Sequence, residues 1–186
     1  MLIVGDIQEM FMPLLDGFLC TPEESGPVID SLMQQIPAMF GDTRETETIL
    51  LPAILAGLEA LKVGFYCPLV LLDAELIILQ ASECAGKLMV FHSSLPTAEG
   101  PGKLKNRDDR KLLATDKERT ILTPQTQAYN QLGQDCVAAG CSVDLFIFNN
   151  AYIDIATIGQ VSRLTGGEVH KYTYFQVGCE GWRGGG

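Results

Sequence analysis

The chain has 186 residues, of which 47% are hydrophobic and 19% charged, and these values suit one globular domain with a single core. Its formal net charge of −10 argues against general nucleic-acid binding, because that function needs a basic face to displace counterions. The six cysteines lack the density and regular spacing of a secreted disulfide scaffold, and so favour a reducing compartment.

The first part of the chain predicts a strand followed by two helices. Residues 1–4, MLIV, predict a buried strand that ends in a turn, and the acids at Asp6 and Glu9 argue against a secretory signal. A first helix should begin near Ser25 and be kinked or ended by Pro37, with a core face formed by Val28, Leu32 and Ile36. A second should span 46–62, where apolar residues recur at helical spacing: Leu51, Ile54, Leu55, Leu58 and Leu61.

The second part alternates strands and helices. The stretch KLMVF, residues 87–91, shows little alternation and predicts a strand buried on both faces. A helix should follow over 123–141, capped by Thr123 and ended by a left-handed Gly140. Residues 143–148 predict another buried strand, 154–167 a short helix, and 168–177 an edge strand. This alternation indicates an α/β fold, Rossmann-like in the broad sense, with helices on both faces of a mostly parallel sheet.

The motifs of common enzymes are missing from the sequence. No GxGxxG follows a strand and no GxxxxGK[ST] phosphate loop is present, so no cofactor is predicted. His92 with Ser93 or Ser94 could serve a small α/β hydrolase or nucleotide-dependent enzyme, but no GxSxG surrounds them. Cys136 and Cys141 have no second pair at metal-binding spacing. We therefore predict no catalytic or metal site.

Positive charge is concentrated in one segment of the chain. Seven of the thirteen Lys and Arg residues, but only four acids, lie between Lys103 and Arg119. Such runs are most often solvated loops. The alternative is a docking surface for an acidic partner, cargo or anionic membrane, and its candidate residues are Lys103, Lys105, Arg107, Arg110 and Lys111.

Four stretches together resemble one family: DIQEMFMPLLDGFL, FGDTRETETILLPAILAGLEALK, HSSLPTAEGPGKLKNRDDRKLLATDKE and VDLFIFNNAYIDIATIGQVSRLTGG. They are similar to the trunk domain of the cargo-adaptor subunit of the COPII vesicle coat, in the C/D-type branch of the Sec-twenty-four family. The resemblance implies a von Willebrand A-like α/β fold and a non-enzymatic role in endoplasmic reticulum-to-Golgi transport. It further implies that the first strands, and a structural zinc ribbon, lie outside this chain.

The resemblance also implies partners. The family's adaptor pairs with a GTPase-activating coat subunit, reaches a small GTPase through it, and reads the cytosolic tails of membrane cargo. The expected location is therefore cytoplasmic and peripheral, at endoplasmic reticulum exit sites and on COPII vesicles. The domain expected from the resemblance covers residues 1–177, and the Gly-rich tail 178–186 does not resemble the family.

Residues 63–80, VGFYCPLVLLDAELIILQ, interrupt the family pattern. As a membrane span the segment is at the short limit of length. Its apolar residues favour insertion by about 3–6 kcal/mol, but Asp73 and Glu75 oppose it by about 5–7 kcal/mol, so we predict no transmembrane span. A real structural insertion and a retained intron remain as alternatives. The intron is favoured because Val63 and Gln80 fit the ends of an in-frame intron.

Overall fold

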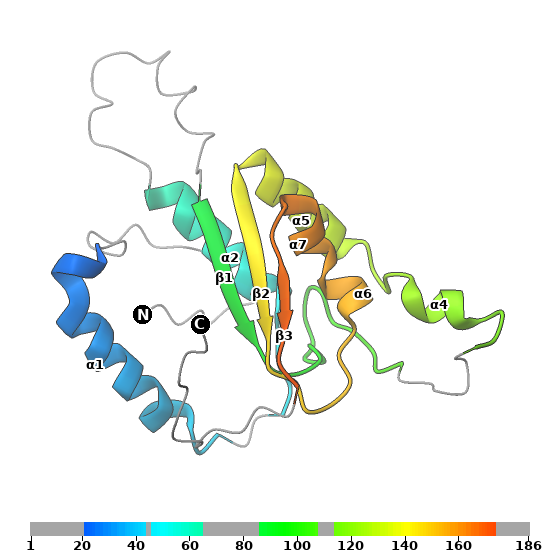
Figure 1. Ribbon diagram of the computed structural model, residues 1–186, viewed down its shortest axis with the longest axis horizontal. Helices are drawn as coiled ribbons and strands as arrows, with labels where there is room; N and C mark the ends of the chain where they lie inside the picture. The colour runs from blue at the N-terminus through cyan, green and yellow to red at the C-terminus, as the bar shows by residue number, and fades with distance from the viewer. Residues whose placement is uncertain (1–20, 44–45, 65–85, 108–113, 174–186) are drawn as a thin grey trace, which may run out of the picture.

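Three parallel strands form the sheet at the centre of the fold (Figure 1). The computed structural model describes residues 21–43, 46–64, 86–107 and 114–173. Strand β1 (Gly86–His92) pairs with β2 (Cys141–Ile147), which pairs in turn with the short β3 (Val169–Lys171). The predicted strands at 87–91 and 143–148 are confirmed, and β3 lies at the sheet edge as expected.

One face of the sheet is covered by helices. Successive side chains of a strand point to opposite faces, and in β2 Val143, Leu145 and Ile147 are fully buried on the same side. Helices α2 (Leu51–Gly64), α5 (Ala128–Ala138) and α7 (Gln160–Thr165) pack onto that side and onto one another. The core is one cluster that includes Leu50, Leu51, Ile54, Leu58, Leu95, Leu104, Tyr129, Leu132, Cys136, Ile158 and Val161.

The opposite face of the sheet exposes aromatic side chains. Phe91, Phe146 and His170 are register partners across the three strands, and their rings stack with centroid distances of 5.0 and 4.7 Å. Met89 and Phe91 are 61% and 66% exposed. The prediction that residues 87–91 are buried on both faces is therefore wrong. The described helices that contact the sheet, α2, α5 and α7, all cover its other face.

Helix α1 (Pro22–Phe40) is longer than predicted and buries no side chain. It begins at Pro22, with Thr21 rather than Ser25 at the N-cap position, and it continues through Pro37 to Phe40. Its expected core face is solvent-exposed, with Val28 at 70% and Ile36 at 38%. In Figure 1 the helix stands apart from the sheet, which explains why its apolar residues find no core.

The predicted helix over 123–141 is shorter in the structure. Helix α4 (Glu118–Leu122) has Thr123 at its C-cap position, so this threonine follows one helix instead of starting the next. Helix α5 begins at Ala128, and Gly140 beyond its end has the predicted left-handed conformation, with φ of 68°. The segment 154–167 forms two short helices, α6 (Ile155–Ile158) and α7, and Gly166 ends the second with φ of 69°.

Several predictions fall on residues outside the described ranges. These are the strand at 1–4, the insertion 63–80 apart from its first two residues, which end α2, and the tail 178–186. Within the described ranges no helix is long and apolar enough to cross a membrane.

Candidate docking surface

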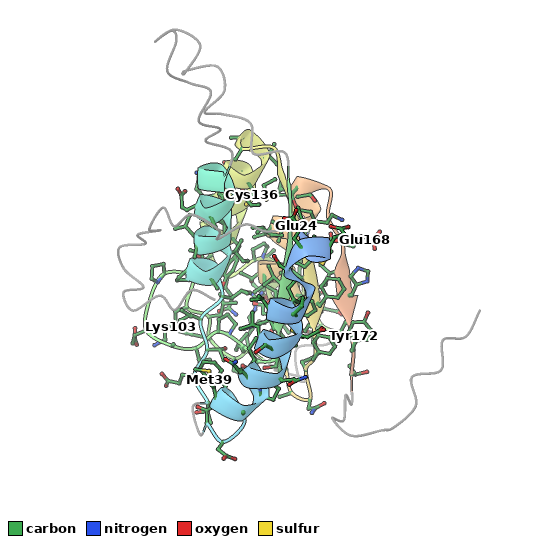
Figure 2. All side chains as sticks on the ribbon, turned by 90° about the vertical axis from the view of Figure 1, so that its left-hand side faces the viewer. Glu24, Met39, Lys103, Cys136, Glu168 and Tyr172 are labelled. Atoms are coloured by element: carbon green, nitrogen blue, oxygen red, sulfur yellow. The ribbon has the colours of Figure 1, made fainter. Side chains whose placement is uncertain are left out.

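The basic segment begins on a loop that one buried leucine fixes to the core. Leu104 is 1% exposed, and its backbone N–H donates to the carbonyl of Pro96 at 2.8 Å. In an extended backbone, successive side chains point in opposite directions. Leu104 points into the core, so its neighbours Lys103 and Lys105 lie at the surface. Figure 2 shows Lys103 at the rim of the molecule. Its ammonium pairs with the exposed carboxylate of Glu99.

The backbone of Lys105 is held by a single side chain. The amide of Gln125 accepts from the Lys105 N–H at 3.1 Å and donates to the Lys105 carbonyl at 2.8 Å. These two bonds satisfy the backbone of Lys105 as a neighbouring strand would, and they leave its side chain exposed to solvent.

Arg107 points inward, toward the carboxylate of Asp154. Its Nε and Nη2 donate to the two Asp154 oxygens, each at 3.0 Å. The side chains are 21% and 1% exposed, so this ion pair is largely removed from water. The guanidinium also donates to the carbonyls of Thr120 and Thr123, at 3.1 and 2.6 Å. Arg107 therefore joins the loop to the end of α4 and the start of α6.

Asp154 is the centre of this polar network. Besides Arg107, it accepts from the N–H and hydroxyl of Thr157, at 3.2 and 2.8 Å, and thereby caps α6. It also accepts from Gln125 Nε2 at 2.6 Å. Partial burial lowers the pKa of Arg107, but its hydrogen bonds and attraction to Asp154 outweigh that effect, so the net pKa of the guanidinium is raised.

The loop approaches the core closely at Gly102. A side chain there would place its Cβ 2.6 Å from Leu51 Cβ, and the φ of 79° favours glycine. The fully buried Tyr129 donates its hydroxyl to the Gly102 carbonyl at 2.9 Å. Burial raises the pKa of this hydroxyl above its ordinary value. The loop is thus fixed at Gly102, Leu104 and Arg107.

The structure separates the five predicted docking residues. Lys103 and Lys105 are available at the surface, whereas Arg107 is engaged by Asp154. Arg110 and Lys111 lie outside the described ranges. The sequence interpretation missed Asp154 and Gln125 as the residues that hold this loop. An aspartate immediately before an apolar helical run is a cap signal, and it could have pointed to Asp154.

The alternative hydrolase site gains no support from the geometry. The buried Nε2 of His92 has no hydrogen-bond partner, and Ser94 Oγ instead meets the hydroxyl of Thr48 at 3.0 Å. Ser93 is exposed at the end of β1. A nucleophile needs a base within hydrogen-bond reach, and neither serine hydroxyl bonds to His92 among the described contacts. Among the residues that the structure describes, no group of three His, Cys, Asp or Glu side chains is placed to hold a metal ion.

Comparison with known proteins identifies the fold and its family. A family model described as the Sec23/Sec24 trunk domain matches residues 1–70 and 66–181. The chain belongs to this family. Human Sec24C is 57% identical and human Sec24D 52% identical, each over 95% of the chain. The crystal structure of the human COPII-coat protein Sec24c has a TM-score of 0.80 at 56% identity, and the match covers 95% of this chain and 21% of that one.

This family membership confirms the predicted resemblance and the von Willebrand A-like α/β class. The chain spans about one seventh of its curated relatives, 14% of Sec24C and 15% of Sec24D. The division into a domain at 1–177, an insertion at 63–80 and a tail at 178–186 stays a prediction.

Proposed function

We propose that this chain acts as part of a COPII cargo adaptor, as a non-catalytic binding and scaffolding module in transport from the endoplasmic reticulum to the Golgi. The observation that carries the proposal is the 57% identity to Sec24C over 95% of the chain. Its partners would be the GTPase-activating coat subunit, a small GTPase reached through that subunit, and cytosolic cargo tails. Its location would be cytoplasmic and peripheral, at endoplasmic reticulum exit sites and on COPII vesicles.

Co-purification with the GTPase-activating coat subunit tests this function. The whole chain and a variant lacking residues 63–80 are each expressed with the tagged subunit. We expect the deletion variant to bind more than the whole chain does, because the family pattern runs directly from the helix before the segment to the strand after it. Failure of both to bind would contradict a scaffolding role for this chain. Equal binding would support the role and place residues 63–80 outside the contact.

Lys103 and Lys105 are the proposed contacts with anionic membrane. Three features support this role: the lysines are exposed, the loop is fixed to the core, and Glu99 neutralises only Lys103. A lysine near an anionic surface contributes about 1 kcal/mol, so reversing the charge of Lys105 should weaken binding roughly tenfold or more.

Sedimentation with vesicles rich in phosphatidylserine measures this effect for Lys105→Glu. The matched control is Arg163→Glu, which reverses an exposed charge on α7 whose guanidinium bonds only to Gln160 in the described contacts. Equal losses for the two variants would show a response to net charge alone. No loss for either would remove the membrane from the proposal while leaving the co-purification result intact.

A further inference from the structure

Thr123 has the exposure and the backbone conformation of a phosphorylation site. It lies at the C-cap position of α4, its side chain is exposed, and Pro124 follows it. A residue before proline is biased toward an extended backbone, and Thr123 has φ of −84° and ψ of 144°. Proline-directed kinases modify threonines of this kind. Figure 1 shows α4 beyond α6, on the side of β3 and away from the outer edge of β1.

Two arginines lie beside the Thr123 hydroxyl. This hydroxyl donates to the Thr120 carbonyl at 2.9 Å, and Nη1 of Arg107 donates to the same oxygen at 3.1 Å. Nη2 of Arg107 also donates to the Thr123 carbonyl at 2.6 Å. Arg119 is exposed and precedes Thr123 by four residues, the spacing that brings side chains together along a helix. A phosphate on the Thr123 oxygen therefore has two guanidinium groups as neighbours, and guanidinium binds phosphate through charge-assisted hydrogen bonds.

We propose that Thr123 is a phosphorylation site for a proline-directed kinase and that Arg107 and Arg119 bind the phosphate. In the reaction the Thr123 oxygen attacks the γ-phosphorus of ATP. A bond from that phosphorus to the Thr123 oxygen forms, and the bond to the bridging oxygen breaks and releases ADP. The hydroxyl proton passes to the aspartate base of the kinase. The product carries about two negative charges at pH 7.

The phosphate regulates the basic loop, a consequence that rests on the proposed membrane contact of Lys103 and Lys105. Gln125, two residues after Thr123, holds the backbone of Lys105 through hydrogen bonds of 3.1 and 2.8 Å. Phosphorylation thus adds negative charge beside this contact and opposes the attraction of the lysines to an anionic surface.

Thr21 is a matched control within the same chain. It is also exposed, it also precedes a proline, and its backbone is similar, with φ of −81° and ψ of 136°. The difference lies in the charges around it, because Glu23 and Glu24 follow and α1 contains no lysine or arginine. In Figure 1, α1 and α4 lie on opposite sides of the sheet.

Mass spectrometry after incubation with ATP and a purified proline-directed kinase tests the site. We expect the whole chain to gain a phosphate at Thr123, and the Thr123→Ala variant to lack it. Modification of Thr21 without modification of Thr123 would show that the kinase is active and rejects the site, and would overturn the proposal.

Phosphorus NMR of the Thr21→Ala chain, phosphorylated at Thr123, tests the two arginines. A nearby cation favours the dianion, so the second pKa of the phosphate should be about 5 in the folded chain, against about 6 in urea. Arg119→Gln should move the folded value back toward about 6, while circular dichroism shows an unchanged fold. The same second pKa in both states would rule out binding by Arg107 and Arg119.

Sedimentation with vesicles rich in phosphatidylserine tests the regulation. The phosphate changes the net charge by about the same amount as Lys105→Glu, so it should also weaken binding roughly tenfold or more. Phosphate on Thr21 in the Thr123→Ala variant adds the same charge away from the loop and should have a smaller effect. Equal losses from the two phosphates would contradict regulation at Thr123. If the unmodified chain does not bind vesicles, the membrane contact fails, whereas a lowered phosphate pKa still supports the site.

Discussion

The two faces of the sheet belong to the same strands but differ in what covers them. On one face the side chains of Val143, Leu145 and Ile147 are fully buried beneath α2, α5 and α7. On the other face Phe91 is 66% exposed although its ring stacks on Phe146. Both faces carry large apolar side chains, although the open face also holds the Lys87–Asp144 ion pair, so the hydrophobicity of a single side chain does not decide its burial in this protein. The position of the helices does.

The helix-covered face contributes to the stability of the fold, whereas the open face is available for interaction. Removing apolar surface from water contributes roughly 25 cal/mol per Å², and the helix-covered face is where that removal is complete. The open face keeps its aromatic surface in contact with water, and exposed patches of this kind mark interaction sites or aggregation liabilities. Substitutions on the two faces should therefore have opposite consequences for folding and for association.

Leu145→Ala should have the largest effect on stability. The side chain is fully buried in the middle of β2, so its loss leaves a cavity in the core. We expect a decrease of about 3 kcal/mol in the free energy of unfolding. Phe91→Ala removes a larger side chain from the open face, and we expect it to cost about 1 kcal/mol or less. Urea denaturation followed by circular dichroism measures both values.

Similar losses in the free energy of unfolding for Leu145→Ala and Phe91→Ala would contradict this distinction between the two faces. Such a result would mean that the open face is covered in solution, for example by pairing between copies. Repeating the measurement at several protein concentrations separates these cases, since stability gained from association depends on concentration.

Arg107→Met should have the second-largest effect. It leaves the carboxylate of Asp154 buried without its cation, and we expect a loss of about 2 kcal/mol, less than for a fully buried pair because Arg107 is 21% exposed. Lys105→Met removes the same charge two residues earlier, where the side chain is exposed, and should stay within about 0.5 kcal/mol of the unmodified chain. Thermal unfolding of the two variants provides the measurement. Equal losses would indicate that the positive charge of the loop matters more than the Arg107–Asp154 pair.

Helices and strands were predictable from the sequence where the apolar side chains of the pattern also pack against other elements in the fold. The leucine spacing of α2 predicted Leu51, Ile54 and Leu58 in the core, and all three are buried. The nearly continuous apolar run at 143–148 likewise predicted a buried strand, and β2 is the middle strand of the described sheet. In α1 the spacing of Val28 and Ile36 is equally helical, yet no element packs on it. Periodicity shows which face of a helix is apolar, and tertiary packing decides whether that face is buried.

The basic loop at residues 103–107 shows the same difference between what the sequence predicts and what tertiary contacts decide. Charge clustering located the loop and selected Lys103 and Lys105 correctly as surface residues, but it gave Arg107 the same role. Arg107 differs because Asp154, 47 residues away along the chain, lies against it in the fold. The sequence contains no signal that joins these two positions. A long-range ion pair of this kind becomes visible only in the structure.

The smallest predicted effect concerns pH and tests burial at the carboxyl end of β1. Burial lowers the pKa of His92, although a backbone hydrogen bond near Ser94 partly opposes the shift. The unfolded chain, with a histidine pKa near 6.5, therefore binds the proton more readily than the folded chain. Stability is full above about pH 6.5 and decreases as pH falls from there toward the lowered pKa of the folded state. The midpoint of thermal unfolding should follow the same course.

His92→Asn should reduce this decrease, because the variant has no group at that position to take up the proton. His170→Gln is the matched control. It removes the chain's other histidine, which stacks on Phe146 at the open face, and should leave the decrease in place. If His92→Asn leaves the decrease unchanged, His92 is not its source, and the imidazole at the carboxyl end of β1 is as accessible to protons in the folded chain as in the unfolded one.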